Sequence, residues 1–314
     1  MSAAHALPAT PSSSLPRPAN MVRSIPEALA SELPSISFEF FPPKTDEAEV
    51  QLWETIRRLE KTRPSFVSVT YGAGGSSRDR TVRVTERIAR ETTLTPLAHL
   101  TCVGHSVSEL RSVIGSFSDA GIRNILALRG DPLGGPDDVW VRHPEGLDHA
   151  EELVELVRGL GAFTVGVAAF PDQHPESLSL DADADVLVRK ADAGAEYAIT
   201  QFFFTREAYL GLRDRVVARG CDLPIIPGLM PVTNVKQLAR MTQLSGQPVP
   251  TSVTARLEAV ADDPDAVREV GVEITTELAQ QLLAEGAPGI HFITMNRSPA
   301  TLRVWDNLGV TAAQ

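Results

Sequence analysis

Cysteine is scarce in this chain of 314 residues, which contains only Cys102 and Cys221. Two cysteines cannot form the disulfide framework of a small secreted protein, and we therefore expect a cytoplasmic protein. Basic residues are also in the minority, because 29 Lys and Arg stand against 40 Asp and Glu, a formal net charge of -11. A surface this acidic argues against nucleic acid or an anionic membrane as the main partner.

Long apolar runs are missing as well, and none approaches the roughly 18 residues that a membrane-spanning helix needs. The N-terminal stretch MSAAHALPATPSSSLPRPANMVRS is rich in Pro, Ser and Ala and lacks the apolar centre of a signal peptide. Residues 1–34 are therefore expected to be a disordered extension, and residues 35–314 to form the folded domain.

Several short signatures of catalysis are absent. There is no Walker-type GxxxxGK[ST], and GAGGSS at 72–77 fails to complete GxGxxG because Ser77 stands at the third glycine position. HExxH, paired-cysteine spacing and GxSxG are missing too, so we expect neither a metal site nor a serine-nucleophile elbow. None of the four lysines lies in an expected strand, which disfavours a Schiff-base aldolase.

The sequence does contain a regular alternation of short apolar runs and amphipathic stretches of helical period. Eight runs are expected to be strands, at 35–41, 65–71, 95–102, 124–130, 164–170, 197–204, 224–230 and 289–296. Short, nearly continuous apolar strands favour a buried parallel sheet, and eight strand–helix units match an α/β fold, the (β/α)8 TIM-type barrel. A doubly wound sheet is the alternative. The segment 232–288 is longer than one crossover needs, and we expect an extra helix there before the eighth strand.

Polar residues stand at the ends of most of these strands. They are Glu39, Thr70, His99, Arg129 with Asp131, Gln201, Asn296 and Arg297. Because active sites of such barrels lie at the C-terminal ends of the strands, we interpret this set as a functional site. Packing alternatives remain for two of its members: His99 as a hydrogen-bonded core histidine, and Arg129 with Asp131 as an internal ion pair.

Seven segments together resemble the methylenetetrahydrofolate reductase family. They are SFEFFPPK, FVSVTYGAGG, HLTC, ALRGD, DAGAEYAITQFFF, IIPGLMPVTN and HFITMNR, in order between about Ser35 and Val310. The resemblance implies an FAD-binding barrel that reduces 5,10-methylenetetrahydrofolate to 5-methyltetrahydrofolate with NADH or NADPH. It also implies ping-pong hydride transfer through the flavin, a product that feeds methionine synthesis, and association into a homo-oligomer.

The same resemblance assigns roles to single positions. It places a general acid at Glu39 and a carboxylate near the flavin and the pterin at Asp131. The implied FAD contacts are Thr70, His99, Arg129, Gly130, Asp131, His149, Ala150, Phe170, His174, Asp183 and Lys190. The implied substrate or nicotinamide contacts are Glu39, Gln201, Gln237 and Arg297.

The chain departs from the family pattern at several places. Phe170 and His149 stand where tyrosine is common, Met241 replaces an aromatic residue, and the segment 131–147 is long for a strand–helix loop and is either a lid or a variable insertion. The chain ends just after the barrel, without the regulatory domain of eukaryotic members. We therefore expect no inhibition by S-adenosylmethionine.

Physical chemistry gives Glu39 a reason to be an acid. The folate ring opens when its N10 is protonated, and a carboxyl group buried among apolar side chains keeps its proton to higher pH. The phenylalanines at 38, 40 and 41 predict such a pocket, with a structural carboxylate paired with arginine as the alternative. Other functions consistent with the pattern are a proline dehydrogenase-like flavoenzyme, a barrel lyase without flavin, and a non-catalytic folate-binding protein.

Overall fold

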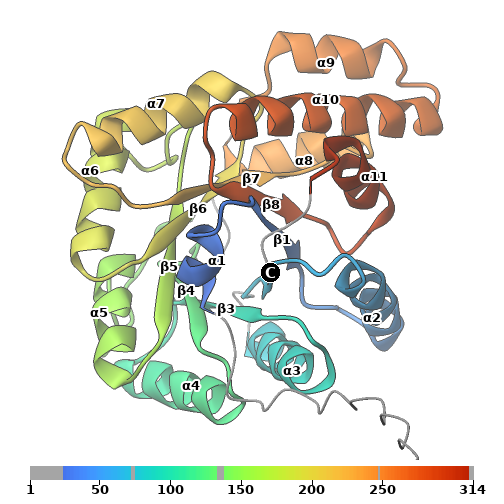
Figure 1. Cartoon of the computed structure of the whole chain (residues 1–314). Coiled ribbons are helices and arrows are strands. Elements are labelled where there is room, and N and C mark those ends of the chain that lie inside the picture. The colour runs from blue at the N-terminus through green and yellow to red at the C-terminus, as the bar shows by residue number, and fades with distance from the viewer. Residues whose placement is uncertain (1–23, 72–74, 133–137, 247, 311–314) are drawn as a thin grey trace, which may run out of the picture.

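The chain folds into a closed barrel of eight parallel strands in sequence order, and β8 pairs with β1 (Figure 1). The computed structural model describes residues 24–71, 75–132, 138–246 and 248–310. The strands are β1 (Ser35–Phe40), β2 (Phe66–Val69), β3 (Pro96–Thr101), β4 (Asn124–Leu128), β5 (Thr164–Ala169), β6 (Tyr197–Phe202), β7 (Ile225–Leu229) and β8 (Gly289–Ile293). The (β/α)8 prediction is confirmed, and the doubly wound sheet is excluded.

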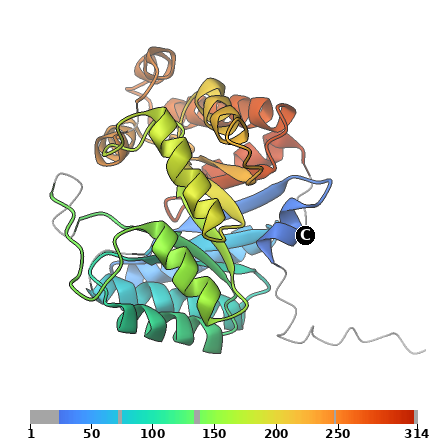
Figure 2. The same ribbon diagram turned by 90° about the vertical axis from the view of Figure 1, so that its left-hand side faces the viewer.

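Helices surround the barrel, and all but the first of them lie outside its wall (Figures 1 and 2). They are α1 (Ile25–Leu29), α2 (Asp46–Glu60), α3 (Gly75–Glu91), α4 (Val107–Asp119), α5 (Ala150–Leu160), α6 (Leu180–Asp192), α7 (Arg206–Val217), α8 (Val235–Ser245), α9 (Thr251–Glu258), α10 (Pro264–Ala284) and α11 (Pro299–Leu308). Three of them, α8 to α10, lie between β7 and β8, so the expected extra helix is present together with one more. Among the described residues, no helix is both long and apolar enough to cross a membrane.

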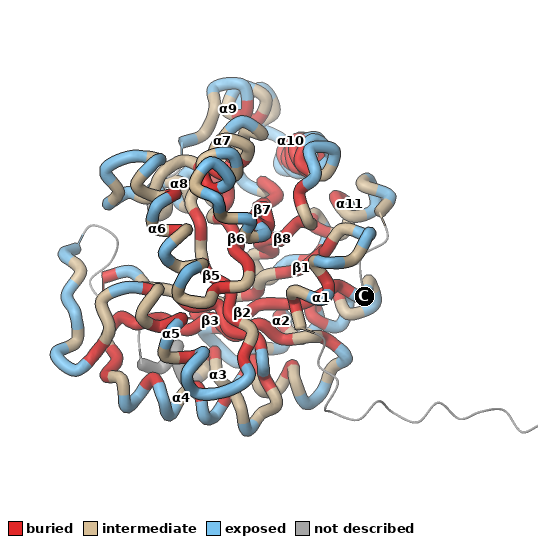
Figure 3. The backbone as a smooth tube through the Cα atoms, turned by 60° about the vertical axis from the view of Figure 1, so that its left-hand side comes forward, coloured by how far each residue is buried: buried red, intermediate tan, exposed pale blue. Residues whose placement is uncertain are grey.

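The side chains of β1 alternate between the two faces of the barrel wall. Phe38 packs outward on Phe292 and Trp305, with ring centroids 6.2 and 6.0 Å away, and Phe40 is fully buried in the same cluster under the helices. Because successive side chains of a strand point to opposite faces, Glu39 points into the barrel. The strands are buried on both faces and the helices expose their outer sides, as Figure 3 shows.

Helix α1 lies against the amino-terminal end of the barrel interior. Its Ile25 is 1% exposed and joins an interior cluster with Phe66, Leu97 and Tyr197. The backbone N–H of Ile25 also donates to Asn124 Oδ1 over 3.4 Å. Residues 24–34, which we expected to be disordered, therefore contain a helix that closes the barrel. Residues 1–23 and the segment 72–74 lie outside the described residues.

Candidate active site

A cavity of about 590 Å³ opens at the carboxyl ends of the strands. Most residues predicted for the site line it, from β1 to β6 and the segments that follow them. They are Glu39, Thr70, His99, Arg129, Gly130, Asp131, His149, Ala150, Phe170, His174, Asp183, Lys190 and Gln201. The barrel therefore brings together side chains that are up to 162 positions apart in the sequence, from Glu39 to Gln201.

Two predicted contacts, Gln237 and Arg297, do not line this cavity. Gln237 lies in the first turn of α8, where its backbone N–H donates to Asn234 Oδ1 over 3.1 Å, and its side chain is half-buried. Arg297 is exposed in the segment after β8. Both residues follow strands at the same end of the barrel as the cavity, but neither belongs to its walls.

Glu39 lies in a polar cluster inside the barrel. Its Oε2 is 3.3 Å from His291 Nε2 and 3.9 Å from His99 Nε2, and the Thr70 hydroxyl donates to Oε1 over 3.3 Å. Burial raises the pKa of this carboxyl group, but the hydrogen bond with His291 and the neighbouring charges lower it by more. The pKa of Glu39 consequently falls below its ordinary value.

This result corrects the expected surroundings of Glu39. We expected phenylalanine rings around the carboxyl group and a raised pKa. The rings of Phe38 and Phe40 pack outside the barrel wall, because side chains alternate along a strand. The side chains around Glu39 are histidines and a threonine. Because its pKa is lowered, Glu39 can act as an acid only if a proton is supplied to it.

His291 is the functional residue that the sequence reasoning missed. Its side chain is fully buried in β8, opposite Ser37 in the register with β1. A signal was available, because a histidine in the middle of an apolar strand raises the same question as a glutamate in β1. The pairing of the first and last strands, which brings these residues together, requires the closed barrel.

Ser37 gives His291 Nδ1 a hydrogen-bond partner in either tautomer of the imidazole. Its Oγ lies 2.7 Å from His291 Nδ1 and 3.4 Å from the Ile290 carbonyl oxygen. When the imidazole is neutral at Nδ1, the serine hydroxyl donates to that nitrogen. When Nδ1 carries a proton, it donates to Ser37 Oγ and the hydroxyl turns to Ile290. His291 Nδ1 therefore keeps a hydrogen-bond partner in either tautomer of the ring.

The deeper part of the cavity contains polar atoms without partners among the described residues. Both ring nitrogens of His99 and the Thr101 hydroxyl are buried and make no hydrogen bond. Burial lowers the pKa of His99 to about 4, so its ring is neutral at pH 7 and can both donate and accept. Because buried polar groups are costly without partners, these atoms fit the heteroatoms of a bound ring system.

Gly130 lies in the turn between Arg129 and Asp131, at the wall of the cavity. Its φ is +87°, a conformation that favours glycine, and an added Cβ would lie 2.5 Å from Val103 Cγ1. The turn between Arg129 and Asp131 therefore requires glycine. The direct ion pair between Arg129 and Asp131, the packing alternative, is not formed, since Arg129 pairs with Glu176 instead.

The opposite end of the cavity carries the charges that suit phosphate. Lys190 Nζ donates to the Ala168 carbonyl oxygen over 2.9 Å, and burial lowers its pKa to about 8. The backbone N–H of His174 donates to Asp183 Oδ2 over 2.9 Å, which fixes the segment between β5 and α6 beside this lysine. Phe170 contacts the His174 ring edge-to-face at 4.6 Å. His149 begins α5 as its N-cap, and Ala150 is buried behind it.

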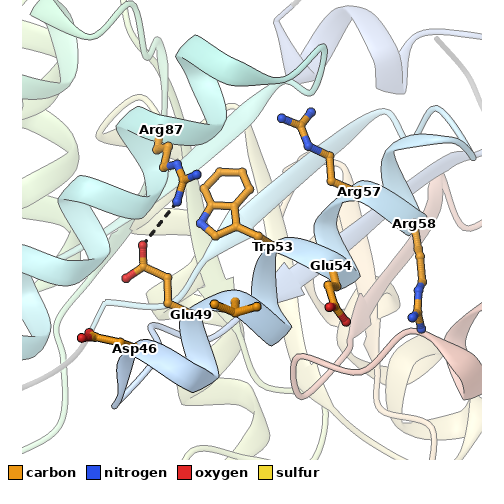
Figure 4. Close-up of a pocket in the computed structure, with 8 residues that line it drawn as sticks. Asp46, Glu49, Trp53, Glu54, Arg57, Arg58 and Arg87 are labelled. Atoms are coloured by element: carbon orange, nitrogen blue, oxygen red, sulfur yellow. Dashed lines mark hydrogen bonds and ion pairs between the residues drawn. The ribbon is translucent and has the colours of Figure 1, made fainter.

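A second hollow, of about 740 Å³, lies on the outer face of α2 and α3 (Figure 4). There the guanidinium of Arg87 lies 4.0 Å from the ring centroid of Trp53 and pairs with Glu49. None of the residues predicted for the functional site lines this hollow, so we place no chemistry in it. Among the described residues, no group of three or more His, Cys, Asp or Glu side chains is arranged to hold a metal ion.

Comparison with known proteins gives the family. The family model described as methylenetetrahydrofolate reductase matches residues 24–309. The 5,10-methylenetetrahydrofolate reductase of Pectobacterium carotovorum subsp. carotovorum is 42% identical over 278 residues, which are 88% of this chain and 90% of that protein. The enzyme of the same name from Escherichia coli (strain K12) is 41% identical over 278 residues, with 88% and 91% covered.

A solved structure resembles the fold. An uncharacterised protein from Clostridium thermocellum, described as binding two copies of 5-methyl-5,6,7,8-tetrahydrofolic acid, superposes with a TM-score of 0.61. It covers 90% of this chain and 97% of its own, at 15% sequence identity. At that identity the likeness supports the barrel fold alone.

Proposed function

The chain belongs to the methylenetetrahydrofolate reductase family, and from this premise we propose that it reduces 5,10-methylenetetrahydrofolate to 5-methyltetrahydrofolate with NADH or NADPH. The observation that carries the proposal is Glu39. Its carboxyl group projects into the cavity at the strand ends, with His291 and Thr70 as hydrogen-bond partners. A titratable acid coupled to a histidine in such a cavity is the arrangement that proton-assisted ring opening needs.

We propose that FAD binds in the 590 Å³ cavity. His99 and Thr101 would hold the flavin ring, since their buried side-chain polar atoms make no hydrogen bond, and the Gly130 turn lines the same cavity. Arg129 and Lys190 would hold the diphosphate, because cations that donate hydrogen bonds match its oxygen atoms. When bound, FAD supplies ping-pong hydride transfer, accepting a hydride from the nicotinamide and later giving it to the folate.

Glu39 is proposed to protonate N10 of the folate, which opens the imidazolidine ring and leaves an electrophilic iminium at N5. Because its pKa lies below the ordinary value in this structure, the proton must reach it as substrate binds. Two features support this. When the rings of a bound substrate cover the Glu39 carboxyl group, they exclude water from it, and this burial favours the protonated form. His291 Nε2, 3.3 Å from Glu39 Oε2, is placed to pass it a proton.

Other residues orient the substrate in this proposal. Asp131 is exposed at the cavity wall, where a carboxylate can accept hydrogen bonds from the pterin. Gln201 is half-buried in β6 and presents an amide to the same cavity. Gln237 and Arg297, which follow β7 and β8, would contact the part of the folate or nicotinamide that extends out of the barrel.

We further propose a cytoplasmic homo-oligomer whose product feeds methionine synthesis. The low cysteine content supports the compartment, and the family resemblance supports the assembly and the metabolic role. Sedimentation equilibrium of the purified protein measures the assembly, and a single species of monomer mass would contradict it.

An anaerobic titration tests the proposed reaction. Purified protein is loaded with FAD and titrated with NADH or with NADPH, which should bleach the flavin absorbance. Addition of 5,10-methylenetetrahydrofolate should restore the absorbance and yield 5-methyltetrahydrofolate, identified by mass spectrometry. Failure to bind FAD would reject the proposal. Recovery of the flavin absorbance with the oxidation product of proline, and not with the folate, would reject it too.

A further inference from the structure

The guanidinium of Arg129 is engaged by a carboxylate of this chain. Its Nη1 donates to Glu176 Oε2 over 2.5 Å and its Nη2 to Glu176 Oε1 over 2.9 Å. Both residues line the cavity at the strand ends. The two guanidinium nitrogens of Arg129 that could donate to two phosphate oxygens therefore already donate to the two carboxylate oxygens of Glu176.

Glu176 is directed toward Arg129 by the segment between β5 and α6. Its backbone N–H donates to His174 Nδ1 over 3.1 Å, and the backbone N–H of His174 donates to Asp183 Oδ2 over 2.9 Å. The hydrogen bond from Arg129 lowers the pKa of Glu176, which keeps the carboxylate charged at neutral pH. The pairing is thus supported by a local hydrogen-bonded framework and is not an isolated surface contact.

The face of the guanidinium is covered as well. Arg129 Cζ lies 5.4 Å from the ring centroid of Trp140, in the long segment after β4 that projects from the barrel in Figure 2. The Arg129 side chain is 23% exposed and that of Glu176 is 48% exposed. Arg129 is therefore held in place by Trp140, while the half-exposed Glu176 side chain can turn into water.

We propose that Glu176 competes with the diphosphate of FAD for Arg129, and that this competition sets how tightly the cofactor is held. The inference rests on the proposed function, because it takes FAD as the ligand. Exchange is physically easy for two reasons. The Glu176 carboxylate is half-exposed, so water can replace Arg129 as its partner, and a diphosphate brings more negative charge to the guanidinium than one carboxylate does.

The opposite role for Glu176 predicts the opposite sign. If Glu176 merely orients Arg129 for the phosphate, removal of its carboxylate should weaken the binding of FAD. A competing carboxylate would make FAD bind more tightly, because both the competition and the repulsion between Glu176 and the diphosphate disappear. The sign of the change in affinity therefore separates the two roles.

The experiment compares the wild type with Glu176→Gln, which keeps the size of the side chain and removes its charge. Dissociation constants and dissociation rates are measured by calorimetry and stopped-flow fluorescence, for FAD and for ADP as a probe without flavin. Glu269→Gln is the matched control. It neutralises a 52% exposed glutamate in a two-pronged pair with Arg303, between α10 and α11.

Glu176→Gln should bind both FAD and ADP about threefold to tenfold more tightly than the wild type, mainly through slower dissociation. The difference should shrink as salt is raised, since screening weakens exposed charges. Glu269→Gln should match the wild type. Thermal unfolding checks that both variants are folded, which their exposed positions favour.

Equal or weaker binding by Glu176→Gln would overturn the competition. Tighter binding by Glu269→Gln to the same extent would overturn it too, because the effect would then reflect net charge alone. If no protein binds FAD, the proposed function fails, and the affinity for ADP decides the role of Glu176 by itself. Absence of ADP binding in both proteins would reject the inference as well.

Discussion

Lys190 should make FAD binding depend on pH. Lys190 is half-buried in the cavity wall, and its amino group donates a hydrogen bond to the Ala168 carbonyl oxygen. Because burial disfavours the charged form, its pKa is lowered to about 8. A bound diphosphate favours the charged form and returns the pKa toward the ordinary value for lysine. Above pH 8, FAD binding must therefore take up a proton.

The size of the effect follows from linkage. The protein without FAD has a pKa of about 8 at this lysine, and the complex is assigned an ordinary value of about 10.4. Below pH 7 the amino group is charged in both forms, and affinity is flat. At about pH 9 the apparent dissociation constant should be roughly tenfold higher than at pH 7, and it should rise by up to about tenfold per further pH unit until about pH 10.

Equilibrium dialysis with FAD, between about pH 6.5 and 9.5, measures this dependence. Lys190→Arg is the control, since arginine stays charged throughout this range and should flatten the curve above pH 8. Lys190→Met should bind FAD weakly at every pH. A flat curve for the wild type, or an unchanged slope in Lys190→Arg, would refute the assignment of Lys190 to the diphosphate.

Three further outcomes are expected. Arg129→Ala should weaken FAD binding by about tenfold to 150-fold, measured by dialysis, because it removes a charge-assisted contact worth about 1.5–3 kcal/mol. Asp131→Asn should retain FAD, raise its reduction potential and slow the folate half-reaction, and an unchanged potential and rate would remove Asp131 from the site. His291→Phe should slow reoxidation by folate and shift its pH profile upward, because the hydrogen bond that lowers the pKa of Glu39 is lost; an unmoved profile would contradict the coupling.

Much of the architecture could be predicted from local patterns. The strand-and-helix alternation gives the barrel, because each apolar run must be buried and eight parallel units close on themselves. Polar residues at strand ends, such as Thr70 and Gln201, then fall in one cavity by the geometry of the fold. The helix α1 was missed because five residues give too little pattern to separate them from the Pro- and Ser-rich stretch before them.

The surroundings of Glu39 could not be predicted in the same way. The residues adjacent to it in sequence are phenylalanines, but the residues adjacent in space come from β3, β8 and the residue that follows β2. The direction of its pKa shift depends on those distant partners. Likewise, nothing near Arg129 in the sequence indicates Glu176, which is 47 positions away and reaches it only through the β5–α6 segment.

The central claim is that Glu39 protonates the folate and takes no part in reduction of the flavin by nicotinamide. Glu39→Gln keeps the size of the side chain but cannot deliver the proton. Stopped-flow absorbance of the FAD-loaded variant measures the two half-reactions separately. Reduction by NADH or NADPH should stay within about tenfold of the wild type, while reoxidation by 5,10-methylenetetrahydrofolate should fall by about 10²–10⁴-fold. Equal losses in both half-reactions would identify Glu39 as a structural carboxylate, and near-normal reoxidation would remove it from the mechanism.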